Sequence, residues 1–263
     1  MSPQFELYAE SDSVINRLDP RTKIIGVFVV FAISVIFTNP LFLGPLFFMI
    51  ITISLLGGVP FSKVAILLKS LSVLVVLSLV MWPLLYHPGK EIFRYGSIYI
   101  TDLGIAYGVG MAFRILNMVI APIILMLTTR QRELILGLRG VGLPQKAAFA
   151  LATTFRFLPM VVGTGNGIIE AQRSRGLDTN KGNIFIRMKN YAAILGPLII
   201  NSLRTAQQLA FAVESKAMSS TAKRTTFRPL HFSKLDTNIM ISYGVLMLVV
   251  IILRVLGLGV FNF

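Results

Sequence analysis

Long apolar runs separated by short polar breaks dominate this chain. Five of the runs carry at most one charged residue each, and they cover 24–37, 41–56, 70–86, 103–129 and 238–256. Runs of this polarity are typical of membrane-spanning helices, although the first two are short for the roughly 20 residues that cross a bilayer core. The pattern predicts an all-α multipass membrane protein with about five transmembrane helices.

The polar breaks have the chemistry of helix ends. Asp19 can accept a hydrogen bond as an N-cap, and Pro20 suits the first helical position. A turn at Thr38-Asn39-Pro40 then separates the first two runs. We expect a capped helix whose cations, Arg21 and Lys23, anchor it at the membrane interface, and a contact to another subunit is the alternative.

The fourth run contains a charge that a membrane helix does not need for spanning. Arg114 is a functional candidate by default and would suit a permease with its own substrate path. Because it lies about a third of the way along the run, its side chain can also snorkel or pair with another subunit, so we favour a structural role. Gly104, Gly108, Gly110 and Pro122 are expected to loosen this helix.

From residue 130 onward the pattern changes. Residues 130–139 alternate cations with Leu and Ile, which predicts an amphipathic interfacial helix that ends at 140–144. Pro159 is expected to mark a kink or restart, and Pro197 to open a further segment. We predict an N-terminal arm with transmembrane helices 1–4 at 1–129, a cytoplasmic coupling domain at 130–237 and a C-terminal transmembrane helix at 238–263.

Two segments between 159 and 218 share an unusual design. Each carries small residues at four-residue spacing, the first stripe being Gly163, Gly167 and Ala171 and the second Ala206 and Ala210. Each also ends in a small-cation-small triplet, the first being Ser174-Arg175-Gly176 and the second Ser215-Lys216-Ala217. Small residues four apart lie on one helix face, so we expect the helices to cross there.

A cation in the last turn of a helix is favourable without any partner, because helix C-termini carry partial negative charge. That explains one cation in each triplet, but not why small residues flank both cations. A cation with small neighbours can enter a groove and bind carboxylate or carbonyl oxygens there. We therefore interpret the two triplets as positive tips that contact a partner protein.

Composition narrows the function classes. The chain has 263 residues, 55% of them hydrophobic, and a formal net charge of +14. Between 130 and 236 there are 16 Lys or Arg against 5 Asp or Glu. The positive-inside rule explains this asymmetry and places the N-terminus and 130–237 in the cytoplasm, so no nucleic-acid partner is predicted.

No catalytic, cofactor-binding or metal-binding residues are predicted. The chain has no cysteine, its two histidines lie far apart, and it lacks a phosphate-binding loop. The acidic or histidine cluster that a membrane-embedded lipid enzyme would need is missing, which makes that alternative the weakest. We expect that the chain is not an enzyme and that any ATP is bound by another chain.

Several blocks resemble the transmembrane T component of energy-coupling factor transporters. They are Leu18-Asp19-Pro20-Arg21-Thr22-Lys23, Arg156-Phe157-Leu158-Pro159, the block from Glu170 to Gly176, Pro197-Leu198, Glu214-Ser215-Lys216-Ala217 and Arg224-Thr225. The resemblance implies membrane helices plus crossed coupling helices, each ending in a small-Arg-small motif that docks in a groove of one ATP-binding cassette subunit. The two triplets would be those motifs, with Lys216 where the family usually has Arg.

The resemblance also implies a function. The chain would be a scaffold in the plasma membrane that couples ATP hydrolysis by two partner ATPase subunits, which bind the ATP and Mg, to uptake through one separate substrate-binding S component. The cargo would be a vitamin or a transition-metal ion. A conventional permease remains the alternative from another class.

Overall fold

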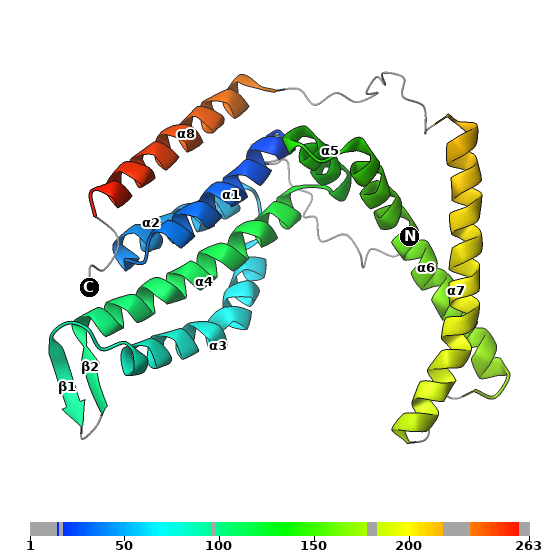
Figure 1. Ribbon diagram of the computed structural model, residues 1–263, viewed down its shortest axis with the longest axis horizontal. Coiled ribbons are helices and arrows are strands. Elements are labelled where there is room, and N and C mark those ends of the chain that lie inside the picture. Colours follow the sequence, from blue (N-terminus) through cyan, green and yellow to red (C-terminus); the bar gives the residue numbers. More distant parts are fainter. Residues whose placement is uncertain (1–14, 16–17, 96–97, 178–182, 218–231, 258–263) are drawn as a thin grey trace. The chain divides into compact units, whose positions relative to one another are not determined.

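The computed structural model describes residues 15, 18–95, 98–177, 183–217 and 232–257 (Figure 1). The described part is almost entirely helical, as predicted, with one β-hairpin. Its helices are α1 (Pro20–Ile36), α2 (Pro40–Leu56), α3 (Phe61–Leu85), α4 (Asp102–Thr128), α5 (Gln131–Val141), α6 (Gln145–Ser174), α7 (Ile184–Ser215) and α8 (Lys234–Val255). The antiparallel strands β1 (Glu91–Tyr95) and β2 (Ile98–Thr101) lie between α3 and α4, in the segment that separates the third and fourth apolar runs.

The chain divides into two compact units. The bundle unit comprises Met1–Gln145 and Leu230–Phe263, and the helix-pair unit comprises Lys146–Pro229. The predicted coupling domain began at residue 130, whereas the structure assigns α5 to the bundle unit. The reason is packing, because α5 lies against α1, where the bare faces of Gly137 and Gly140 meet Pro20 and Arg21.

Four described helices are long and apolar enough to cross a membrane, namely α3, α4, α6 and α8, and the apolar helix α2 is shorter. The protein is therefore a multipass membrane protein. The set differs from the five runs expected, because α1 and α2 have 17 residues each. At 1.5 Å per residue such a helix spans about 25 Å, less than a bilayer core of about 30 Å. Helix α6 qualifies because its N-terminal half is apolar.

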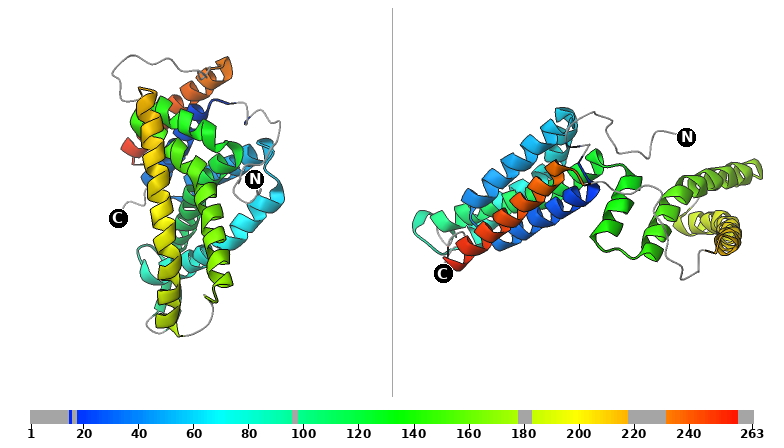
Figure 2. Two further views of the ribbon diagram at one scale, coloured as in Figure 1. Left: turned by 90° about the vertical axis from the view of Figure 1, so that its right-hand side faces the viewer. Right: turned by 90° about the horizontal axis from the view of Figure 1, so that it is seen from above.

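Helix α4 is the centre of the bundle unit and packs against α1, α2 and α3 (Figure 2). Its glycines were expected to loosen it, but they are buried sites of close packing. A Cβ built on Gly104 would lie 2.6 Å from the carbonyl oxygen of Tyr86, and one on Gly108 would lie 3.2 Å from Cδ of Pro83. The bare faces of these residues therefore let α3 approach the backbone of α4 closely.

Arg114 stabilises the C-terminal end of α1. Its guanidinium donates hydrogen bonds to the carbonyl oxygens of Ser34 (2.7 Å), Val35 (3.3 Å) and Phe37 (2.7 Å). The last carbonyls of a helix have no partner within the helix, so a cation placed there satisfies them and complements the helix dipole. The structural role that we favoured from the sequence is the one that these bonds support.

The first turn of α1 is joined to two other helices, α4 and α8. As predicted, Asp19 is the N-cap, and its carboxylate accepts from the Arg21 amide at 2.8 Å. Asp236, at the start of α8, accepts from the Asp19 amide at 2.9 Å and from the Thr22 hydroxyl at 3.2 Å. Lys23 donates to the last carbonyl of α4, that of Thr128, at 3.0 Å. These bonds hold the ends of α1, α4 and α8 together.

Candidate functional site

Helices α6 and α7 are longer and more regular than the sequence suggested. The predicted interruption at Pro159 and the predicted start at Pro197 are wrong, because both prolines lie inside continuous helices (Figure 1). Helix α6 has 30 residues and α7 has 32, which corresponds to about 45 Å and 48 Å of helix. Each triplet thus lies at the C-terminal end of a long helix.

The first triplet forms a complete C-terminal cap. Gly176 has a φ of +86°, in the left-handed region that glycine adopts without strain. Its amide donates to the carbonyl of Arg173 at 2.9 Å, and the amide of Leu177 donates to that of Gln172 at 3.0 Å. This pair of bonds is a Schellman motif, and it places Arg175 at the last position before the chain turns away.

The second triplet repeats this geometry. Ala217 occupies the position of Gly176, with a φ of +51°, and its amide donates to the carbonyl of Glu214 at 2.8 Å. It is the only non-glycine residue with a positive φ among those the structure describes. In both triplets the serine hydroxyl donates back to its own helix, Ser174 to the carbonyl of Glu170 and Ser215 to that of Ala212. Arg175 and Lys216 therefore occupy equivalent positions.

Both cations are exposed to solvent. Among the described residues, the one salt bridge joins Arg94 to Glu91, so neither Arg175 nor Lys216 is paired within that part of the chain. The neighbouring carboxylates of Glu170 and Glu214 are exposed as well. The two positive charges are thus available to a partner, and their small neighbours leave room around them.

The two triplets lie at opposite ends of the helix-pair unit. Helices α6 and α7 run in opposite directions, and only residues 175–183 separate them in sequence (Figures 1 and 2). A partner that binds the first triplet therefore approaches one end of the unit, and a partner that binds the second approaches the other end. The arrangement suits two separate docking partners.

The helices touch beside the predicted stripes. Gly163 and Gly167 have no heavy atom within 4 Å of a built Cβ, and Ala171 is exposed. The second stripe is exposed too. The half-buried positions of α6 include Thr164, Ile168 and Gln172, and those of α7 include Ser202, Thr205 and Leu209. The role of the stripes in helix crossing therefore stays a prediction.

One residue that the sequence reasoning did not single out connects the two helices. Gln172 Nε2 donates a hydrogen bond to the carbonyl oxygen of Ala193 at 3.3 Å, which joins α6 to α7. Gln172 belongs to the block that includes the first triplet, and Ala193 lies four residues before Pro197. That spacing was the available signal, because a proline leaves the carbonyl four residues earlier without its helical donor.

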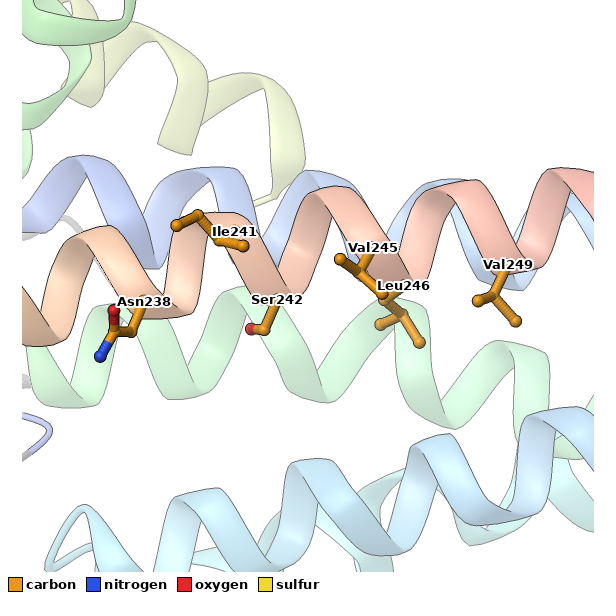
Figure 3. A pocket seen from close by; sticks show the side chains of 6 residues that line it. All are labelled: Asn238, Ile241, Ser242, Val245, Leu246 and Val249. Carbon is orange, nitrogen blue, oxygen red and sulfur yellow. The ribbon is translucent and has the colours of Figure 1, made fainter.

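Other parts of the described chain offer no competing chemistry. An open groove of about 560 Å³ on α8 is lined by six side chains without a titratable group (Figure 3). The described residues contain no cluster of His, Asp and Glu that could hold a metal ion. The predicted family block Arg224-Thr225 lies outside the described residues.

Comparison with known proteins gives a consistent result. Residues 11–226 match the family model of the cobalt transport protein CbiQ. The chain is 32% identical to the energy-coupling factor transporter transmembrane protein EcfT of Thermosediminibacter oceani, over 91% of this chain and 93% of that protein. It is 31% identical to EcfT of Acidaminococcus fermentans, over 87% and 88%, and 28% identical to EcfT of Bacillus subtilis, over 94% and 96%.

Proposed function

Because this chain belongs to the CbiQ and EcfT family of transmembrane transporter components, we propose that it is the scaffold of an energy-coupling factor importer in the plasma membrane. The scaffold couples ATP hydrolysis by two ATP-binding cassette subunits to uptake through a separate substrate-binding membrane subunit. The N-terminus and the helix-pair unit face the cytoplasm, as the excess of cations between 130 and 236 favours. In this proposal α6 does not cross the membrane, although its length and composition would permit it.

The observation that carries the proposal is the equivalence of the two triplets. Each presents one exposed, unpaired cation at the capped end of a long helix, and the two ends lie apart. A groove with carbonyl or carboxylate oxygens on each ATPase subunit would bind such a tip through charge-assisted hydrogen bonds. Two tips at opposite ends of one unit support two ATPase subunits, one on each triplet.

The two proposed docking contacts, at Arg175 and at Lys216, differ in their directionality. Arg175 offers a planar fork of donors that can bind two oxygens at once, whereas Lys216 offers a compact charge on a flexible stem. We infer that the Lys216 contact is less directional than the Arg175 contact. Lys216→Arg should therefore be tolerated at the second docking site.

In this proposal the cargo, a vitamin or a transition-metal ion, passes through the separate substrate-binding subunit. The partner ATPases bind ATP and Mg²⁺. The main support for a permease with its own path was Arg114, and the hydrogen bonds of that side chain to the end of α1 account for it. The absence of a titratable group from the α8 groove also disfavours a polar substrate path there.

Charge reversal tests the docking role. The transporter is reconstituted with Arg175→Glu or Lys216→Glu, and we measure co-purification of the ATPases, ATP hydrolysis and uptake. Each variant should lose co-purification or hydrolyse ATP without uptake, because a carboxylate repels the acidic or carbonyl oxygens of the groove. Arg173→Glu and Arg204→Glu are the controls, since both arginines are exposed on the same helices but lie outside the triplets. Uptake at the wild-type level in both triplet variants would refute the docking role.

A further inference from the structure

Pro197 leaves a backbone acceptor free in the middle of α7. Proline has no amide hydrogen, so the carbonyl oxygen four residues earlier, that of Ala193, lacks the helical hydrogen bond that every neighbouring turn has. A half-buried carbonyl without a partner carries a free-energy cost, which usually ends or bends the helix at that place. Helix α7 nevertheless continues on both sides of Pro197.

The missing donor comes from α6. The side-chain amide of Gln172 donates to the Ala193 oxygen at 3.3 Å, and both residues are half-buried. The long side chain of glutamine reaches across to the second helix without requiring the two backbones to approach each other. The bond therefore satisfies the acceptor that Pro197 exposes and ties α6 to α7 at that level.

The rest of the interface between the two helices is sparse. Most side chains of α6 and α7 are exposed, and Ile194, next to Ala193, is one of the few buried ones in this unit. A small contact with a directional hydrogen bond fixes the point at which α6 and α7 meet, but it permits the two helices to rotate about that point. An extended, interlocked interface would resist such a rotation.

We propose that Gln172 and the carbonyl freed by Pro197 form the pivot about which α6 and α7 change their crossing angle. Gln172 is a positioning residue, because it acts on the two triplets through the helices that carry them. The inference rests on the proposed coupling function for its consequence, which is that motion at one triplet reaches the other helix at this point.

A double-mutant cycle at Gln172 and Pro197 tests the pivot. Gln172→Leu removes the donor and should lower uptake per ATP hydrolysed about five- to tenfold, the low end of typical coupling effects. In a Pro197→Ala background the new Ala amide can bond the Ala193 oxygen within the helix, so Gln172→Leu should then have little further effect. Uptake is measured with radiolabelled cobalt(II) or a radiolabelled B vitamin, whichever the co-purified substrate-binding subunit accumulates.

A distance measurement gives a readout that does not depend on transport. The chain has no native cysteine, so spin labels can be placed at Asn166→Cys on α6 and Gln208→Cys on α7, both exposed positions. In the assembled transporter, Gln172→Leu should broaden the distance distribution between the labels, and adding Pro197→Ala should not broaden it further than Pro197→Ala alone. Gln207→Leu is the control, because it replaces the same residue type at an exposed position of α7 that lies outside the pivot.

The outcomes separate the pivot from the docking role. The pivot would be overturned if Gln172→Leu lowered uptake equally in the wild-type and Pro197→Ala backgrounds. It would also be overturned if Gln172→Leu left both uptake and the distance distribution at their wild-type values. If the charge-reversal variants keep wild-type uptake, the docking role fails, while the distance cycle still decides about the pivot. Should Gln172→Leu not assemble, Gln172→Asn serves the same cycle, because its amide is one methylene shorter and cannot reach the Ala193 oxygen.

Discussion

Replacing Arg114 by Met should destabilise the bundle unit. The change removes three hydrogen bonds to the end of α1, two of them at 2.7 Å. It also leaves the carbonyls of Ser34 and Phe37 without these donors in a largely apolar setting. The side chain of Met fills a similar volume, so the loss reports on the bonds and the charge more than on packing.

The size of the effect follows from the two short bonds. A hydrogen bond to a charged group contributes about 1.5 kcal/mol net at the low end of its range, so the two short bonds together contribute about 3 kcal/mol. We add nothing for the third, at 3.3 Å, because its partner carbonyl is exposed. A loss of this size lowers the midpoint of thermal unfolding by roughly 6 to 12 °C for a chain of this length.

Thermal unfolding of the detergent-purified chain measures the loss. Arg254→Met is the matched control, because Arg254 is an exposed arginine in the last turn of α8 whose side chain makes no hydrogen bond to the described residues. It should change stability by less than about 0.5 kcal/mol. Arg114→Lys should lie between the two, since an ammonium cannot copy the fork that bonds two carbonyls at once.

The same variants separate the structural role of Arg114 from a transport role. If Arg114 lined a substrate path, Arg114→Met would abolish uptake while the unfolding midpoint stayed at the wild-type value. That result would refute the capping argument and revive the permease alternative. A lower midpoint with Arg254→Met unchanged is the result that our reasoning requires.

Three further predictions concern single buried or strained groups. Asn117→Leu should change the free energy of unfolding by less than about 1 kcal/mol, although Asn117 is fully buried. The lost bond to the Leu43 carbonyl (3.2 Å) is offset because the change also removes a side-chain oxygen that has no partner among the described residues. Chemical unfolding in detergent measures the difference. Ala217→Gly should stabilise the C-terminal cap of α7 by about 0.5–1 kcal/mol, and Gly176→Ala should destabilise that of α6 by a similar amount, because both positions have a positive φ. Hydrogen exchange of the amides in the last turn of each helix should therefore slow in the first variant and accelerate in the second. Burial lowers the pKa of Lys23 to about 8, despite the attraction of Glu133, Asp236 and Asp19. Between about pH 8 and the ordinary pKa of 10.5, the unfolded chain therefore holds a proton that the folded chain has released. Wild-type stability should therefore rise relative to Lys23→Met as the pH increases from about 8 to about 10, and a constant difference over that window would contradict the assignment.

Local signals in the sequence were sufficient for the helix ends. Asp19 caps α1 and Asn39 caps α2 as their residue types suggest, because an N-cap depends on the residue and the two or three amides after it. The cations and small residues of both triplets likewise identified two C-terminal ends, since a left-handed cap is also a local structure. The β-hairpin was missed although 91–101 contains Ile and aromatic residues on both sides of a Gly-Ser pair.

Tertiary compensation was beyond the reach of local reasoning. Pro197 alone predicts a helix boundary, whereas α7 is continuous there and the Ala193 carbonyl accepts a hydrogen bond from Gln172, which lies 25 residues before Pro197 in the chain. The half-buried positions of α6 could not be inferred from its small residues either, because small residues permit close approach but do not require it. These positions contain larger side chains such as Ile168, whose burial removes more apolar area from water than a bare glycine can.

The position of the Gln172 contact makes the two triplets mechanically unequal. Arg175 lies three residues beyond Gln172, about 5 Å along α6, whereas Lys216 lies 23 residues beyond Ala193, about 34 Å along α7. If the two triplets dock as proposed, a force on the second triplet would act on a long arm and rotate α7 effectively, while the same force on the first triplet would produce little rotation. A short arm suits a fixed attachment, and the guanidinium of Arg175 offers the more directional contact there. The flexible side chain of Lys216 would suit a contact that follows a moving helix end.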